Sequence, residues 1–123
     1  MKQLYIIRGL PGSGKTTLAH KLSPIVYEAD QYFVRYGVYK FEPTLLKEAH
    51  AWCQAQVVQS MQNEAPVIAV SNTSTQKWEY QPYIDFAQQF GYTVFVIVCQ
   101  NDFGNIHGVP PDAIERMRSR WEA

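Results

Sequence analysis

The sequence predicts an α/β fold of three layers, in which a short parallel sheet lies between helices. Two observations carry this prediction. Apolar runs of strand length alternate along the chain with amphipathic helical patterns, which is typical of β-α-β units. A glycine-rich segment also joins the first apolar run to the first helical pattern. With 123 residues, of which 46% are hydrophobic, the chain has the size and apolar content of one compact domain covering residues 1–123.

Four apolar runs are expected to form the sheet, at residues 4–8, 25–29, 67–71 and 93–99. Apolar residues at three- and four-residue spacing predict a long helix over residues 44–63. A further helix should end at Gly91, but its start stays open: Pro82 suits a first helical turn, so residues 76–81 are a candidate separate turn. A last helix is expected after Pro110, with Ile114, Met117 and Trp121 on one face.

The segment between the first strand and the first helix has the spacing of a phosphate-binding P-loop. Glycines allow successive backbone N–H groups to turn inward around a polyphosphate, and the new helix directs its positive dipole end at the same anion. Lys15 is expected to reach the β- and γ-phosphates, and the Thr16 hydroxyl to ligate Mg²⁺. The nucleotide-binding residues are therefore predicted to be Gly9, Pro11, Gly12, Ser13, Gly14, Lys15, Thr16 and Thr17.

Asp30 and Asn72 follow two other predicted strands, and ligands bind beyond the carboxyl ends of such strands. Asp30 suits a catalytic general base for a substrate hydroxyl, or a contact to Mg²⁺; an ordinary acid in a turn is the alternative. Asn72 would orient a phosphate or a metal-bound water, or only form a turn. The third strand lacks the acidic pair of hydrolytic ATPases, and the chain lacks the Asn-Lys-x-Asp guanine reader. A kinase is therefore favoured.

Aromatic and cationic residues interleave over residues 32–41, beside Asp30. They would form a stacking platform for a single-stranded nucleic-acid end, or they cover the sheet edge and the long helix. On the last helix, pairing of Asp112 with Arg116 and of Glu115 with Arg118 is the alternative to substrate binding. The candidate substrate contacts are Arg35, Tyr36, His107, Arg116 and Arg120.

Composition narrows the partners and the compartment. Eleven basic and eleven acidic residues give a net charge of zero, so any nucleic-acid contact must be local, and no membrane association is expected. The chain shows neither an apolar run of spanning length nor an export signal, which predicts a cytoplasmic protein, or one of the host cytoplasm if a phage encodes it. Cys53 and Cys99 lack metal-ligand spacing and are expected to be reduced packing residues.

The motifs together resemble a known family. The P-loop, Glu28-Ala29-Asp30, Val70-Ser71-Asn72-Thr73 and His107-Gly108-Val109-Pro110 look like the kinase domain of phage polynucleotide 5′-hydroxyl kinases, and still more like the small ATP-binding proteins of bacteria and phages related to them. The resemblance implies a P-loop kinase fold with strand order 2-3-1-4, ATP and Mg²⁺ as cofactors, and transfer of the γ-phosphoryl group to a hydroxyl acceptor. It also implies that Asp30 is the general base and that Lys15 and Thr16 hold phosphates and metal.

Three departures from that family bear on catalysis. Phe33 stands where the polynucleotide kinases carry an arginine for the acceptor phosphate, and Asn72 stands where they carry an acid. Residues 100–111 contain no Lys or Arg, although a kinase lid normally supplies arginines to the γ-phosphate. The acceptor therefore stays open between a polynucleotide 5′-hydroxyl and a small hydroxyl substrate. The alternative function is a nucleotide-binding module without catalysis, or a slow ATPase switch, that partners another protein.

Overall fold

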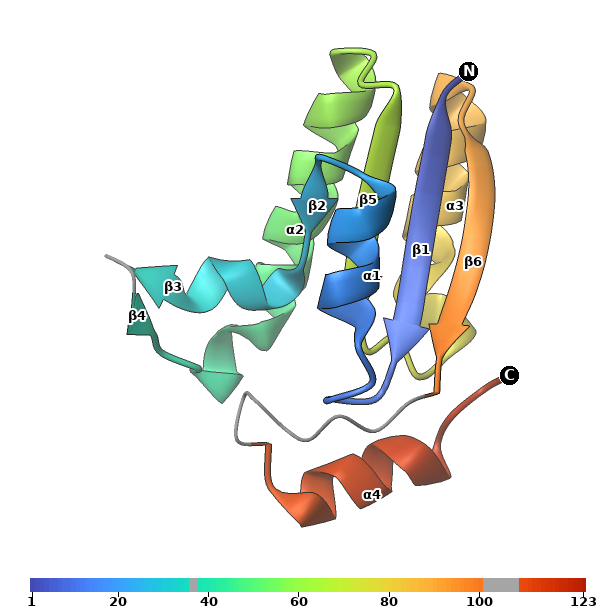
Figure 1. The fold of residues 1–123 in the computed structure, drawn as a ribbon. Coiled ribbons are helices and arrows are strands. Elements are labelled where there is room, and N and C mark those ends of the chain that lie inside the picture. The colour runs from blue at the N-terminus through green and yellow to red at the C-terminus, as the bar shows by residue number, and fades with distance from the viewer. Residues whose placement is uncertain (36–37, 101–108) are drawn as a thin grey trace.

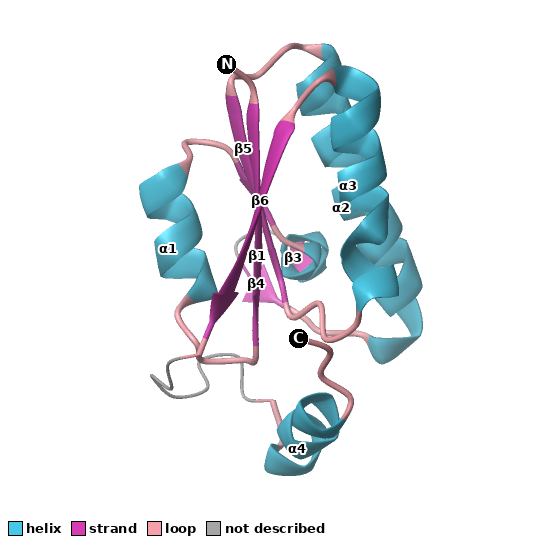
Figure 2. Ribbon diagram, turned by 90° about the vertical axis from the view of Figure 1, so that its right-hand side faces the viewer, coloured by secondary structure: helices cyan, strands magenta, loops and turns pink. Residues whose placement is uncertain are grey.

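The protein folds into three layers, with a parallel sheet between two layers of helices. The computed structural model describes residues 1–35, 38–100 and 109–123. The sheet consists of β1 (Gln3–Gly9), β2 (Val26–Tyr27), β5 (Val67–Asn72) and β6 (Thr93–Cys99). Helix α1 (Lys15–Leu22) covers one face, and α2 (Leu46–Gln62) and α3 (Lys77–Phe90) cover the other (Figure 1, Figure 2).

The strand order is β2-β5-β1-β6, and all three pairings are parallel. Counted within this sheet alone, the order is 2-3-1-4, so the expected fold class and strand order are confirmed. The register places Ile7 beside Ser71 and Arg8 beside Asn72. The carboxyl ends of β1 and β5 therefore lie next to each other at one edge, from which the P-loop leaves β1.

Side-chain alternation along the strands divides the core between the two faces. Leu4 and Ile6 of β1 belong to the larger cluster, which packs against α2 and α3. Ile7 belongs to the smaller cluster, with Ala69 of β5 and Ala19 of α1. All five are at most 1% exposed, so the position of β1, and with it the start of the P-loop, is set from both faces.

The second strand is shorter than expected. β2 ends at Tyr27, whereas the sequence predicted a strand over residues 25–29. The reason is a side chain from the neighbouring strand: Oδ1 of Asn72 accepts a hydrogen bond of 2.9 Å from the backbone N–H of Ala29. The chain then enters the 3₁₀ helix η1 (Ala29–Phe33), which carries Asp30 in its first turn.

A small antiparallel hairpin, β3 (Val34–Arg35) and β4 (Val38–Tyr39), follows η1. The 3₁₀ turn η2 (Pro43–Leu45) then leads into α2. These segments form the part of the molecule that extends beyond the β2 edge of the sheet in Figure 1.

Two expectations for the later helices are wrong. α3 runs without interruption from Lys77, so residues 76–81 do not form a separate turn, and Pro82 lies inside the helix. Its ring removes one backbone donor, for the carbonyl of Trp78. α4 (Pro111–Ser119) ends before Trp121, which therefore does not share a helical face with Ile114 and Met117. Among the described residues, no helix is long and apolar enough to cross a membrane.

Candidate functional site

The P-loop adopts a backbone path that glycine makes feasible. Gly12 and Gly14 have φ angles of 82° and 91°, a region that L-residues with a Cβ rarely adopt. Gly9 is required for space: an added Cβ would overlap Ser13 Oγ and lie 2.9 Å from the Cys99 carbonyl oxygen and 3.1 Å from Lys15 Cγ. Half-buried Pro11 lies in the turn between them. The loop is thus wrapped tightly against the ends of β1 and β6.

Polar groups converge inside this loop. The side chain of Ser13 is 3% exposed, and its Oγ has no hydrogen-bond partner among the described residues. Gly14 is the N-cap of α1, and no described side chain caps its first turn, which begins Lys15-Thr16-Thr17; Thr17 is exposed there. Buried donors without partners are rare, and uncapped helix N-termini bind anions. The arrangement fits a polyphosphate.

Lys15 folds back onto the loop. Its Nζ donates to the carbonyl oxygen of Leu10 at 3.3 Å. Burial lowers the pKa of Lys15 from its ordinary value, whereas the nearby Glu28, Asp30 and Cys99 act in the opposite direction, with Glu28 the strongest of them. An anion in the loop would add to the stabilisation of the charged form.

Glu28 belongs to the site, although it was not among the predicted site residues. Oε1 of Glu28 accepts a hydrogen bond of 2.5 Å from Thr16 Oγ1. The Thr16 hydroxyl, predicted to ligate Mg²⁺, is therefore bonded to Glu28 rather than to Asp30. The sequence did carry a signal, because Glu28 and Asp30 alternate at the end of the second predicted strand.

Asp30 lies half-buried in the first turn of η1. The Tyr39 hydroxyl donates to its Oδ1 at 3.4 Å. Burial, together with the charge and the hydrogen bond of Asp30, raises the pKa of Tyr39 to about 12, so this hydroxyl keeps its proton. Asp30 influences Lys15 electrostatically, so the predicted general base and the predicted phosphate-binding lysine lie in one neighbourhood.

The side chain of Asn72 supports the backbone of the neighbouring segment. Its Oδ1 holds the backbone of Ala29, and its Nδ2 lies 3.9 Å from the sulfur of Cys53. Asn72 therefore fixes where the chain leaves β2, directly between Glu28 and Asp30. Its predicted contact to a phosphate or a metal-bound water stays a prediction.

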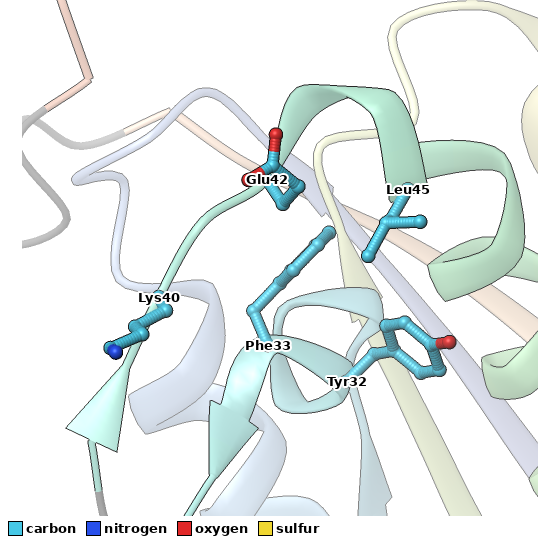
Figure 3. A pocket seen from close by; sticks show the side chains of 5 residues that line it. All are labelled: Tyr32, Phe33, Lys40, Glu42 and Leu45. Atoms are coloured by element: carbon cyan, nitrogen blue, oxygen red, sulfur yellow. The ribbon is translucent and has the colours of Figure 1, made fainter.

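The aromatic segment after Asp30 is partly core and partly surface. Phe33 is 3% exposed and meets the ring of Phe41 edge-on, with centroids 5.2 Å apart. Tyr32 packs beside Trp52 of α2. A pocket of about 200 Å³ opens here, lined by the five residues that Figure 3 shows: Tyr32, Phe33, Lys40, Glu42 and Leu45. Ligand pockets commonly measure about 300 to 1,000 Å³, so this one would hold only part of a substrate.

The predicted substrate contacts are only partly placed. Tyr36 and His107 lie outside the described residues, and Arg35 belongs to β3. Arg116 is exposed on α4, which lies beyond the carboxyl edge of the sheet (Figure 1, Figure 2). Arg120 directs its Nε to Thr75 Oγ1 at 3.2 Å. The alternative pairing on this helix is present for Arg118, which meets Glu115 at 3.2 Å.

A second feature that sequence reasoning missed is the environment of Arg8. This residue of β1 is 2% exposed, and its guanidinium carbon lies 4.5 Å from the ring centres of both Tyr80 and Trp121. Arg8 also donates to the backbone carbonyls of Ser74, Thr75 and Glu122, at 2.9, 3.3 and 2.5 Å. Arg8 therefore attaches the segment after α4 to the carboxyl edge of the sheet.

Comparisons with known proteins agree with this geometry. Residues 4–106 match the AAA domain family. Human NEDD4-binding protein 2 is 33% identical over 133 residues, which include 97% of this chain. The chain spans only 8% of the length of that relative.

Solved structures show the same fold. Kti12 from Chaetomium thermophilum, in complex with ADP-AlF3, has a TM-score of 0.69 at 15% identity, covering 98% of this chain and 80% of that one. The Pnkp1/Rnl/Hen1 RNA repair complex contains a chain with a TM-score of 0.72 at 18% identity, covering 97% of this chain and 43% of that one. This chain therefore belongs to the AAA domain family and has a P-loop kinase-like fold.

Proposed function

We propose that this domain binds Mg-ATP and transfers its γ-phosphoryl group to a hydroxyl acceptor. The observation that carries the proposal is the P-loop, in which Lys15 folds back onto the loop and is influenced by the charge of Asp30. One tight loop brings together three features: the buried Ser13 hydroxyl without a described partner, the uncapped start of α1, and Lys15 with its lowered pKa. The complex of the structural neighbour Kti12 with ADP-AlF3 supports the choice of nucleotide.

Bound Mg-ATP supplies the γ-phosphoryl group, which breaks its bond to the β-phosphate oxygen and forms one to the acceptor oxygen. The chain's own residues position the reacting groups and neutralise the charge of the phosphates. The loop N–H groups and Lys15 hold the phosphates, and the Thr16 hydroxyl faces the cation. Asp30 accepts the proton of the acceptor hydroxyl. Tyr39 donates a hydrogen bond to Asp30 and so orients its carboxylate.

The acceptor would approach from the hairpin side of Asp30. Tyr39, which donates to Asp30, also meets the ring of Phe33, with centroids 6.4 Å apart, and Phe33 lines the pocket in Figure 3. The half-buried ring of Tyr32 and the exposed Lys40 at this pocket suit a nucleic-acid end, since bases stack on rings and lysine meets phosphates; Glu42 also lines the pocket. We take a polynucleotide 5′-hydroxyl as the first acceptor to test; the RNA repair complex among the structural neighbours supports this choice.

A nucleotide-binding module without transfer, or a slow ATPase switch that partners another protein, is the second candidate. The position of Arg120 favours it, because its guanidinium is bonded to Thr75 Oγ1. An arginine at the γ-phosphate contributes about 10³- to 10⁵-fold in rate where kinases and GTPases use one.

The test is transfer of labelled γ-phosphate from Mg-ATP to a 5′-hydroxyl oligonucleotide. We expect transfer by the wild type and by Asp85→Asn, an exposed control on α3, and loss of transfer in Lys15→Ala and Asp30→Asn. Transfer no greater than that of Lys15→Ala would overturn the polynucleotide acceptor. Release of phosphate without an acceptor, abolished by Lys15→Ala, would support the ATPase switch instead.

A further inference from the structure

The carboxylate of Glu28 lies at the amino end of α1, where a phosphate is expected. Glu28 has extended backbone at the end of β2, and its side chain reaches the first turn of α1 to accept the Thr16 hydroxyl. It is half-buried, and among the charged groups near Lys15 it has the largest effect on that lysine. Neither the β-phosphate nor the γ-phosphate of a nucleotide could approach this carboxylate without strong repulsion, unless a cation lay between them.

We propose that Glu28 is a direct magnesium ligand of the nucleotide site, together with the Thr16 hydroxyl. This inference rests on the proposed function, because the metal is the one that accompanies the nucleotide. Mg²⁺ at nucleotide sites is held by one or two carboxylates, water and phosphate oxygens in an octahedron. One carboxylate and one hydroxyl from this chain fit that requirement.

The geometry of the two oxygens agrees with a shared cation. Neighbouring ligands of an octahedral Mg²⁺, each at about 2.1 Å from the metal, lie about 3 Å apart. Thr16 Oγ1 and Glu28 Oε1 are 2.5 Å apart in the hydrogen-bonded arrangement. A separation increased by about 0.5 Å would place both oxygens on one octahedron, which a side-chain rotation provides.

Ser71 supplies a second, independent observation. Its side chain is 3% exposed, and its Oγ has no hydrogen-bond partner among the described residues. Ser71 is paired in register with Ile7, whose side chain packs against Ala19 of α1, so Ser71 also faces α1. A buried hydroxyl without a partner is costly. A metal-bound water on the α1 side of this sheet edge would satisfy it.

The end of β5 carries no acid that could hold the cation, whereas Glu28 lies directly after β2. In this chain β5 ends with the neutral Ser71 and Asn72. Asn72 instead holds the backbone N–H of Ala29, the residue after Glu28. Asn72 is therefore a positioning residue for the segment that carries the metal ligand. Glu28 and Asp30 therefore have different partners: Glu28 accepts a hydrogen bond from Thr16, and Asp30 accepts one from Tyr39.

The test measures how much Mg²⁺ strengthens ADP binding. Calorimetry is run on the full chain in EDTA and in Mg²⁺, for the wild type, Glu28→Gln and Glu64→Gln. Glu64 is an exposed carboxylate that pairs with Lys2 at 3.7 Å and so serves as the matched control. We expect Mg²⁺ to strengthen ADP binding about tenfold in the wild type and in Glu64→Gln, and less than twofold in Glu28→Gln. In EDTA, Glu28→Gln should bind ADP at least as tightly as the wild type, because a repulsive charge is gone.

Glu28→Gln with the full tenfold gain would overturn the assignment while leaving the proposed function intact. A wild type that binds no ADP in either condition would overturn both.

Ser71→Ala gives a second measurement that does not depend on the folding of Glu28→Gln. Ser71→Ala removes a hydroxyl without a described partner, so the unfolding temperature should stay the same or rise. The factor by which Mg²⁺ strengthens ADP binding should fall about threefold. An unchanged factor would contradict the water-mediated contact. Electron paramagnetic resonance of Mn²⁺ provides a direct readout: by linkage, Mn²⁺ should bind ADP on the wild type about tenfold more tightly than free ADP, and less than twofold more tightly on Glu28→Gln.

Discussion

Gly9→Ala tests whether the P-loop needs glycine at position 9 for space rather than for its backbone conformation. The added Cβ would lie 2.9 Å from the carbonyl oxygen of Cys99 and 3.1 Å from Lys15 Cγ, and it would overlap Ser13 Oγ. The two side chains can move, but the Cys99 carbonyl belongs to β6, which is paired with β1. Overpacking of this kind costs about 1 to 3 kcal/mol of the free energy of unfolding.

The same overlap should weaken nucleotide binding. Moving Ser13 and Lys15 out of the loop removes contacts to phosphate, and a tenfold loss of affinity corresponds to about 1.4 kcal/mol. We expect Gly9→Ala to bind ADP at least tenfold more weakly, as measured by calorimetry, and to lose about 1 to 3 kcal/mol in urea unfolding.

Gly91→Ala is the matched control. Gly91 has a φ of 77°, and apart from its own chain neighbours no atom lies within 4 Å of an added Cβ. Its cost is therefore conformational alone, about 1 to 2 kcal/mol. Both variants should lose similar stability, but only Gly9→Ala should lose affinity for ADP. Wild-type ADP affinity in Gly9→Ala would refute the steric account of the loop.

Three further predictions concern other parts of the molecule. Arg8→Met leaves three carbonyl oxygens without their donor and should lower the free energy of unfolding by about 3 kcal/mol, with a change in Trp121 fluorescence; an unchanged urea midpoint would contradict this role. Pro82→Ala restores a helical hydrogen bond to Trp78 and should raise the free energy of unfolding by about 1 to 3 kcal/mol, whereas a lower value would mean that packing of the proline ring outweighs the bond. Asp30→Asn should slow phosphoryl transfer about 10²- to 10⁴-fold in single-turnover assays with ADP affinity unchanged, and wild-type turnover would exclude it as the base.

The sequence predicted those parts of the fold that depend on local pattern. The four strands and the P-loop follow from apolar runs and glycine spacing, and the bounds of every strand lie within two residues of the expected ones. The strand order was implied by the family resemblance and is confirmed. The P-loop was recognisable because each of its residue types meets a demand of the backbone or of the phosphate.

Contacts between distant segments could not be predicted in this way. The early end of β2 depends on Asn72, which is 43 positions from Ala29 in the sequence. The carbonyl partners of Arg8 are 66 to 114 positions away, so a buried cation at the end of an apolar strand gave no indication of what surrounds it. Pro82 was misjudged because tertiary packing of α3 outweighs the loss of one helical hydrogen bond.

The central claim is that this P-loop binds Mg-ATP through Lys15, and calorimetry of Mg-ATP with the wild type and Lys15→Ala tests it most directly. Burial lowers the pKa of Lys15, so replacing it should cost little stability. We predict that the wild type binds Mg-ATP at least tenfold more tightly than Lys15→Ala, with equal unfolding temperatures. Equal affinities, or no heat of binding with the wild type, would contradict the account.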